Sequence, residues 1–158
     1  VYQAEVDGYK TWNKYFGRGL SVDGFKTALH DFLFNGRRFL HELIPDILTQ
    51  LRQLSQVVRS LDGFRFYSSS LLIMYEGAPT CGPSEESEQV APPATSISSS
   101  GAGLTVDVKM IDFAHSSLPT SNASAVRHRG PDTGYLFGLD NLIRLLEELL
   151  SSTVPLTV

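Results

Sequence analysis

The stretch VDVKMIDFAH, residues 106–115, contains an aspartate and a histidine whose spacing suits chemistry on phosphate groups. Alternating apolar and polar side chains predict a β-strand that ends near Asp112. A carboxylate just past a strand can hold Mg²⁺ against the phosphates of a nucleotide, because the strand fixes the positions of its oxygens. His115 could then reach a reacting hydroxyl. The ten residues alone also fit an exposed acid at a strand end.

Other catalytic and phosphate-binding patterns are missing from the sequence. GRGLSV and GAGLTV each lack the third glycine of G-x-G-x-x-G, and no Walker A sequence occurs. The four histidines have no zinc-site spacing, and there is one cysteine. Ser69, Asp112 and His115 follow the chain order of an α/β-hydrolase triad, but no G-x-S-x-G surrounds the serine. We therefore discount a hydrolase.

The net charge of −4 conceals a basic segment. Residues 10–38 contain six lysines and arginines against two aspartates, so this stretch is +4 and the remainder is −8. A local cationic patch on an acidic protein suits a small polyanion better than a long nucleic acid, which usually needs a broad basic face. The alternative is a set of solvated charges on helix surfaces.

Length and composition indicate one ordinary domain with its own core: 158 residues, of which 42% are hydrophobic. No apolar run is long enough to span a membrane, and no signal-peptide pattern opens the sequence. The single cysteine, Cys81, excludes an intrachain disulfide. We therefore expect a reducing location, the cytoplasm or the nucleus, and no membrane partner.

The first part of the chain predicts a short extended segment followed by two helices. Residues 1–6 are expected to be extended, with a turn at Asp7-Gly8. Ser21 is a credible N-cap for a helix that Asn35-Gly36 would close. A second amphipathic helix follows and reaches Val58, and Pro45 either kinks it or marks its first turn.

The second part predicts strands and a final helix, which gives an α+β fold of antiparallel strands packed with helices. Residues 64–77 are expected to form one long strand or a hairpin, and residues 104–111 a second strand. Between them, residues 78–103 are rich in Pro, Ser and Gly and are expected to be a disordered insert. A polar loop over 116–134 and a helix over 136–151 complete the chain.

Four motifs stand in a familiar order: NKYFGRGLS, FYSSSLLIMYEG, KMIDFAHS and GPDTGYLFGLDNLI. Together they resemble the C-terminal part of inositol polyphosphate kinases, and they are most similar to the inositol hexakisphosphate kinase branch. The resemblance covers nearly the whole chain except residues 78–103. It implies a two-lobed fold related to protein kinases, with ATP between the lobes.

The resemblance also implies roles for individual residues. Asp112, in a triplet similar to the Asp-Phe-Gly of protein kinases, would be the Mg²⁺ ligand, and His115 would lie near the acceptor phosphate or hydroxyl. Ser69 belongs to a serine-serine-leucine-leucine motif in which alternation lets one hydroxyl face the cleft. Lys14 and Arg18 would contact the inositol phosphate. Phe16 stands where the family more often has tyrosine.

One family motif, P-x-x-x-D-x-K-x-G, is absent, and so is the ATP lobe with its lysine. Asp107-Val108-Lys109 copies only the centre of the motif, because Gly103 and Ile111 occupy the outer positions. We therefore expect residues 1–158 to be the C-terminal lobe of a longer enzyme, inactive without its N-terminal lobe. The expected reaction is ATP-dependent phosphorylation of inositol hexakisphosphate. The alternatives are a kinase of a lower inositol phosphate hydroxyl and a non-catalytic binding module.

Overall fold

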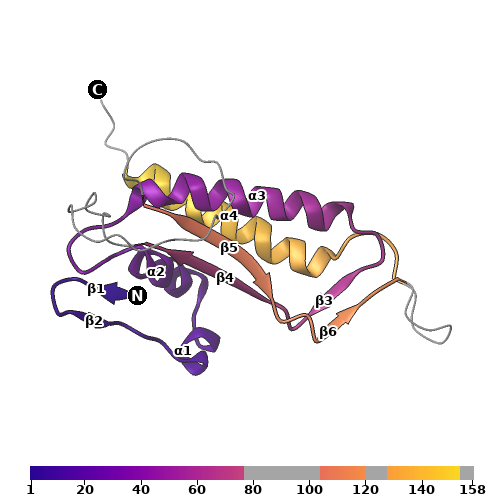
Figure 1. The fold of residues 1–158 in the computed structure, drawn as a ribbon, viewed down its shortest axis with the longest axis horizontal. Helices are drawn as coiled ribbons and strands as arrows, with labels where there is room; N and C mark the ends of the chain where they lie inside the picture. Colours follow the sequence, from indigo (N-terminus) through magenta and orange to yellow (C-terminus); the bar gives the residue numbers. More distant parts are fainter. Residues whose placement is uncertain (77–103, 120–127, 154–158) are drawn as a thin grey trace, which may run out of the picture.

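The computed structural model describes residues 1–76, 104–119 and 128–153. In these ranges two long helices, α3 and α4, lie side by side against a two-stranded antiparallel sheet, β4–β5, one of three two-stranded sheets that the structure describes (Figure 1). The helices are α1 (Lys14–Arg18), α2 (Val22–Phe32), the 3₁₀ turn η1 (His41–Leu43), α3 (Ile44–Ser60) and α4 (Thr133–Thr153). The strands are β1 (Tyr2–Gln3), β2 (Gly8–Tyr9), β3 (Arg65–Tyr67), β4 (Ser70–Tyr75), β5 (Val106–Ile111) and β6 (His115–Ser117). The predicted α+β architecture is confirmed.

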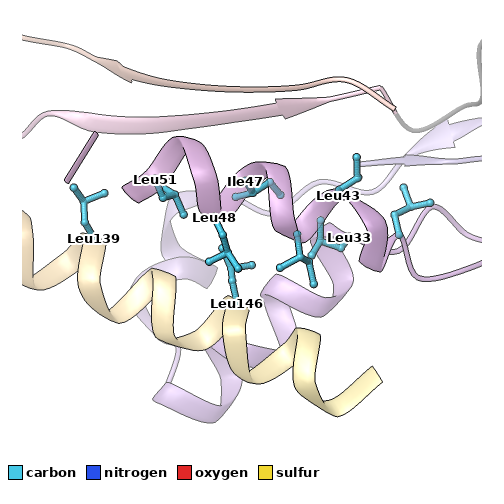
Figure 2. Packing of buried hydrophobic residues seen from close by; sticks show 9 residues of the cluster. Leu33, Leu43, Ile47, Leu48, Leu51, Leu139 and Leu146 are labelled. Carbon is cyan, nitrogen blue, oxygen red and sulfur yellow. The ribbon is translucent and has the colours of Figure 1, made fainter. Parts of the chain in front are cut away.

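The hydrophobic core lies where α3 packs against α4 and the end of α2 (Figure 2). Its nine members are at most 3% exposed: Leu33, Leu40, Leu43, Ile44, Ile47, Leu48, Leu51, Leu139 and Leu146. Burial of each side chain stabilises the fold by about 2 kcal/mol before chain entropy is counted. Ion pairs of α3 with α4, Arg52–Glu147 at 2.6 Å and Arg59–Asp140 at 2.7 Å, show that the two helices are antiparallel.

Helix α2 begins where the sequence predicted but ends earlier than predicted. Ser21 caps the helix as predicted, because its Oγ accepts a hydrogen bond from Gly24 N–H at 3.1 Å. The helix ends at Phe32, before the predicted stop at Asn35-Gly36. Gly36, with φ +89°, instead lies in a tight turn before α3, a conformation for which glycine is suited.

The first residues of the two long helices decide the role of Pro45 and correct the predicted start of the last helix. Pro45 is the second residue of α3 and so marks its first turn, where no intrahelical N–H bond is lost. The last helix begins at Thr133 rather than 136, and β6 occupies part of the predicted loop over 116–134. The predicted insert, residues 78–103, lies outside the described residues.

The N-terminal segment forms a small hairpin instead of one extended run. β1 pairs with β2, and residues 4–7 make the turn, with Asp7 at φ 46°. The extended segment is therefore shorter than predicted, and Gly8 lies in a strand. The sequence also gave no sign of α1, a short helix capped by the side chain of Asn13.

Residues 64–76 contain two strands that do not pair with each other, so neither a single strand nor a hairpin is correct. β4 pairs with β5 from Ser70↔Ile111 to Tyr75↔Val106, and β3 pairs with β6. The two ladders form one interrupted ribbon (Figure 1). Within the described ranges, no helix is apolar and long enough to cross a membrane.

Candidate functional site

The two facing segments of the ribbon, β3–β4 and β5–β6, are both interrupted at the same place. There, residues 68–69 lie opposite residues 112–114, between the β3–β6 and β4–β5 ladders. Because three residues oppose two, the ribbon bends there, as it does at a β-bulge. Ser68 has φ 59° and Asp112 has φ 63°, values that few residues other than glycine adopt. Such backbone conformations are concentrated at functional sites.

Asp112 lies directly after β5, as the sequence predicted, and its side chain is exposed. No hydrogen bond or ion pair of its carboxylate is found among the described residues. These residues also contain no group of three His, Cys, Asp or Glu side chains that could hold a metal ion. A lone carboxylate nonetheless fits Mg²⁺, which commonly binds one or two protein carboxylates, with phosphate oxygens and water completing its shell.

His115 is the first residue of β6, and its side chain is exposed. It lies opposite Tyr67 of β3, so the two side chains share one face of the ribbon. The hydroxyl of Tyr67 is 3.3 Å from Nε2 of His128. Tyr67 is thus an aromatic neighbour of His115 that the sequence did not predict, and the His115 imidazole is exposed on the surface.

Ser69 lies in the break, and its partly buried side chain borders a groove of about 670 Å³. Its Oγ is buried and has no hydrogen-bond partner among the described residues. Ser70 is exposed and Leu71 partly buried, as predicted from strand alternation. Mostly apolar side chains of α2 and α4 line the groove. Ser69 thus carries a hydroxyl without a partner in the described ranges, next to the groove but covered, so a ligand atom could bind it only after neighbouring groups move.

Lys14 and Arg18 are the first and last residues of α1, and both are exposed. Neither has an ion-pair partner in the described ranges. Three of the other four cations of the basic segment are paired: Lys10, Lys26 and Arg38 bind Asp31, Glu148 and Glu42 at 2.7, 2.6 and 2.5 Å. Half of the predicted patch is therefore neutralised. The two residues chosen for phosphate binding keep their charge available.

The structure brings some predicted site residues together and leaves others apart. Ser69 and Asp112 lie in the same break of the ribbon, one on each of its two facing segments. The groove that contains Ser69 also reaches Gly17 and Leu20 at the end of α1, beside Arg18. Asp112 and His115 do not line that groove. The structure thus has two neighbouring parts, a ribbon break with a carboxylate and an apolar groove next to a cationic helix.

Sequence reasoning missed Asp132, the buried residue that connects α4 to the ribbon. Its carboxylate accepts hydrogen bonds from Tyr135 N–H at 3.0 Å and from Phe66 N–H at 2.8 Å. The available signal was an aspartate directly before a helical pattern, which is an N-cap signature. The predicted helix start at residue 136 placed Asp132 in the preceding loop, three residues too far from the helix to cap it.

Comparison with known proteins places these features in a family. The family model for inositol polyphosphate kinase matches residues 1–147. The chain belongs to the inositol polyphosphate kinase family. It is 45% identical to human inositol hexakisphosphate kinase 3 over 151 residues, and 40% identical to mouse inositol hexakisphosphate kinase 1 over 169 residues. Each match covers 94% of this chain but only 37% and 38% of the relative, respectively.

A solved structure of an inositol phosphate multikinase supports the fold. The chain is similar to the inositol phosphate multikinase of S. cerevisiae, whose crystal structure is a complex with ADP and Mn²⁺. The TM-score is 0.62 at 22% identity, and the match covers 87% of this chain and 50% of the multikinase chain. The predicted kinase-like architecture is therefore confirmed. The division into a single C-terminal lobe stays a prediction.

Proposed function

We propose that the full-length protein transfers the γ-phosphoryl group of ATP to inositol hexakisphosphate and produces a diphosphoinositol phosphate. The observation that carries this proposal is the family match over residues 1–147, with relatives named inositol hexakisphosphate kinases at 38–45% identity. The carboxylate of Asp112, which has no ion-pair or hydrogen-bond partner among the described residues and lies in a strained break of the ribbon, supports it.

Asp112 is the residue that would hold Mg²⁺ in this proposal. Its carboxylate is exposed, without an ion-pair partner in the described ranges, and anchored at the end of a strand. A bound Mg²⁺ neutralises negative charge on the nucleotide phosphates. The end of β5 and the break fix the position of the Asp112 backbone, which limits the reorganisation needed when the charged nucleotide arrives.

The acceptor would be bound by hydroxyl, imidazole and cationic groups. His115 donates a hydrogen bond to the acceptor phosphate, and Ser69 donates one from its Oγ once the groups that cover this atom move aside. Arg18 offers several N–H groups in a plane, which suits a phosphate, while Lys14 contributes a point charge. In the transfer itself, an acceptor oxygen bonds to the γ-phosphorus as the bond to the bridging oxygen breaks, and ADP leaves.

Product analysis tests this function. The full-length protein is incubated with ATP and Mg²⁺ and, in separate reactions, with inositol hexakisphosphate or a lower inositol phosphate, and each product is examined by ³¹P NMR for a diphosphate linkage. A product with only monophosphate esters, formed from a lower inositol phosphate, would indicate hydroxyl phosphorylation instead. Binding of inositol phosphates without ADP formation would indicate a non-catalytic module.

The location in the cytoplasm or nucleus remains part of the proposal. It rests on the single cysteine of the sequence and on the intracellular availability of ATP. Microscopy of the tagged full-length protein tests it, and a secreted or membrane-bound signal would contradict it.

A further inference from the structure

Asp132 is one of two buried polar residues in the described ranges, with 7% of its surface exposed. Its two carboxylate oxygens have different partners. Oδ1 accepts from Tyr135 N–H at 3.0 Å and closes the first turn of α4. Oδ2 accepts from Phe66 N–H at 2.8 Å, in β3. A single side chain therefore joins the beginning of α4 to the ribbon.

Phe66 and Tyr135, whose N–H groups donate to Asp132, also extend the contact toward the break through their aromatic rings. Phe66 and Tyr135 pack edge to face, with centroids 5.8 Å apart. Phe66 also packs edge to face on Phe113, at 6.4 Å. Phe113 directly follows Asp112 in the chain. A continuous set of contacts thus leads from Asp132, through Phe66 and Phe113, to the peptide that carries the Asp112 carboxylate.

Asp112 requires support of this kind. Its φ of 63° is a strained backbone conformation for a residue other than glycine, and it lies outside both strand ladders. Phe113 is itself 52% exposed, so its ring contact with Phe66 is one of few restraints on the segment. A residue keeps such a conformation only when its surroundings hold it.

We propose that Asp132 is a positioning residue for the Asp112 carboxylate and that it acts through Phe66 and Phe113. This inference rests on the proposed function, in which Asp112 holds the metal ion. Asp132 is too deeply buried to contact a substrate. Without its bond to Phe66, the ribbon can shift relative to α4, and the carboxylate of Asp112 is no longer held in one place.

The variant Asp132→Asn separates this role from helix capping. Asparagine is as good an N-cap as aspartate, so its oxygen can still accept from Tyr135 N–H. Its NH₂ group then takes the second position and cannot accept from Phe66 N–H. β3 stays attached, because the Arg65 guanidinium donates to the carbonyl oxygens of Gly130 and Arg129 at 3.0 and 2.9 Å. We therefore expect the variant to fold.

The first measurement is hydrogen exchange of the metal-free full-length protein. We expect exchange of residues 112–117 to be roughly tenfold faster in Asp132→Asn than in wild type, because the local opening free energy falls. The second measurement is turnover against Mg²⁺ concentration. We expect kcat to fall roughly tenfold to a hundredfold and half-maximal Mg²⁺ to rise, with the KM for the inositol phosphate unchanged.

Asp62→Ala is the matched control. The Asp62 carboxylate accepts a hydrogen bond from Gly130 N–H, close to the same helix start, and no hydrogen bond or ring contact in the described ranges joins it to Phe66. Its loss should lower the melting temperature without changing exchange at 112–117, kcat or the Mg²⁺ dependence. If Asp62→Ala reproduces the Asp132→Asn effects, the positioning role is wrong and the effect is one of general stability.

Phe113→Leu tests the same inference where folding is not at risk, since this side chain is half exposed. It should also speed exchange at 112–117 and raise the Mg²⁺ requirement. Wild-type exchange and Mg²⁺ dependence in Phe113→Leu would overturn the inference, even if Asp132→Asn failed to fold.

An active Asp112→Asn would instead overturn the proposed role of Asp112. An inactive Asp112→Asn beside a fully active Asp132→Asn would overturn the positioning role alone.

Discussion

The hydroxyl of Tyr75, in β4, donates a hydrogen bond to the main-chain carbonyl oxygen of Phe32, the last residue of α2. The two rings pack edge to face, with centroids 5.1 Å apart. Burial raises the pKa of the Tyr75 hydroxyl to about 12. This contact joins the sheet to α2 at the end of the ribbon opposite the break.

The raised pKa predicts a loss of stability at alkaline pH. In the unfolded chain this hydroxyl ionises near pH 10, and in the folded protein near pH 12, so the folded state keeps the proton between the two values. The contribution is complete below pH 10 and disappears as the pH approaches 12. Allowing for partial solvent contact, we expect a loss of about 1–2 kcal/mol.

Urea unfolding between about pH 9 and pH 11.5 measures this loss. Tyr75→Phe is the control, because it keeps the ring against Phe32 and removes the ionising group. The difference in unfolding free energy between wild type and Tyr75→Phe should shrink as the pH rises. A difference that is constant across this range would contradict the prediction.

Asp112→Asn should abolish turnover in the full-length protein and leave the fold nearly unchanged. The substitution removes the anionic metal ligand but keeps the size of the side chain, and a loss of about 3 kcal/mol of transition-state stabilisation is expected. The same change at Asp107, whose carboxylate pairs with Lys109 at 2.6 Å in β5, should leave kcat close to wild type. Turnover of Asp112→Asn within about tenfold of wild type would rule out the ligand role.

The sequence predicted elements that local patterns determine. Ser21 as an N-cap and the alternation of β4 follow from neighbouring residues, and both are confirmed. The break at Ser68 and Asp112 could not be predicted, because it depends on pairing between segments far apart in the chain. The same holds for Asp132, whose second partner is 66 residues away. Motif resemblance identified the family, whereas tertiary contacts decide how its residues are held.

Lys14→Gln and Arg18→Gln should each weaken binding of inositol hexakisphosphate without affecting stability. Neither cation has an ion-pair partner in the described ranges, and a charge-assisted bond to phosphate contributes about 1.5–3 kcal/mol. The loss should be largest at low salt, since salt screens exposed charges. Titration calorimetry at two salt concentrations measures it. Lys26→Gln is the control: Lys26 is paired with Glu148 at 2.6 Å, so its loss should affect stability more than affinity.

Residues 78–103, which lie outside the described residues, should be replaceable by a short Gly-Ser linker. The strands that flank them are already paired, with Tyr75 opposite Val106 and Glu76 N–H donating to Thr105 O at 3.0 Å. A short turn can therefore connect them. We expect the shortened full-length protein to keep its kcat and melting temperature. Loss of folding would show that the replaced residues form an ordered part of the core.

Gln50 should be required for the stability of β5. Its Nε2 donates to Val106 O, and its Oε1 accepts from Val108 N–H, both at 2.9 Å. A side chain of α3 thus takes the place of a neighbouring strand along one edge of β5, whose other edge pairs with β4. Gln50→Leu leaves the amide and carbonyl unpaired under the helix, which should cost about 2–3 kcal/mol in urea unfolding. Gln53→Leu, an exposed position of the same helix, should change the unfolding free energy by less than about 0.5 kcal/mol. Equal effects of the two substitutions would show that water replaces the Gln50 bonds without loss.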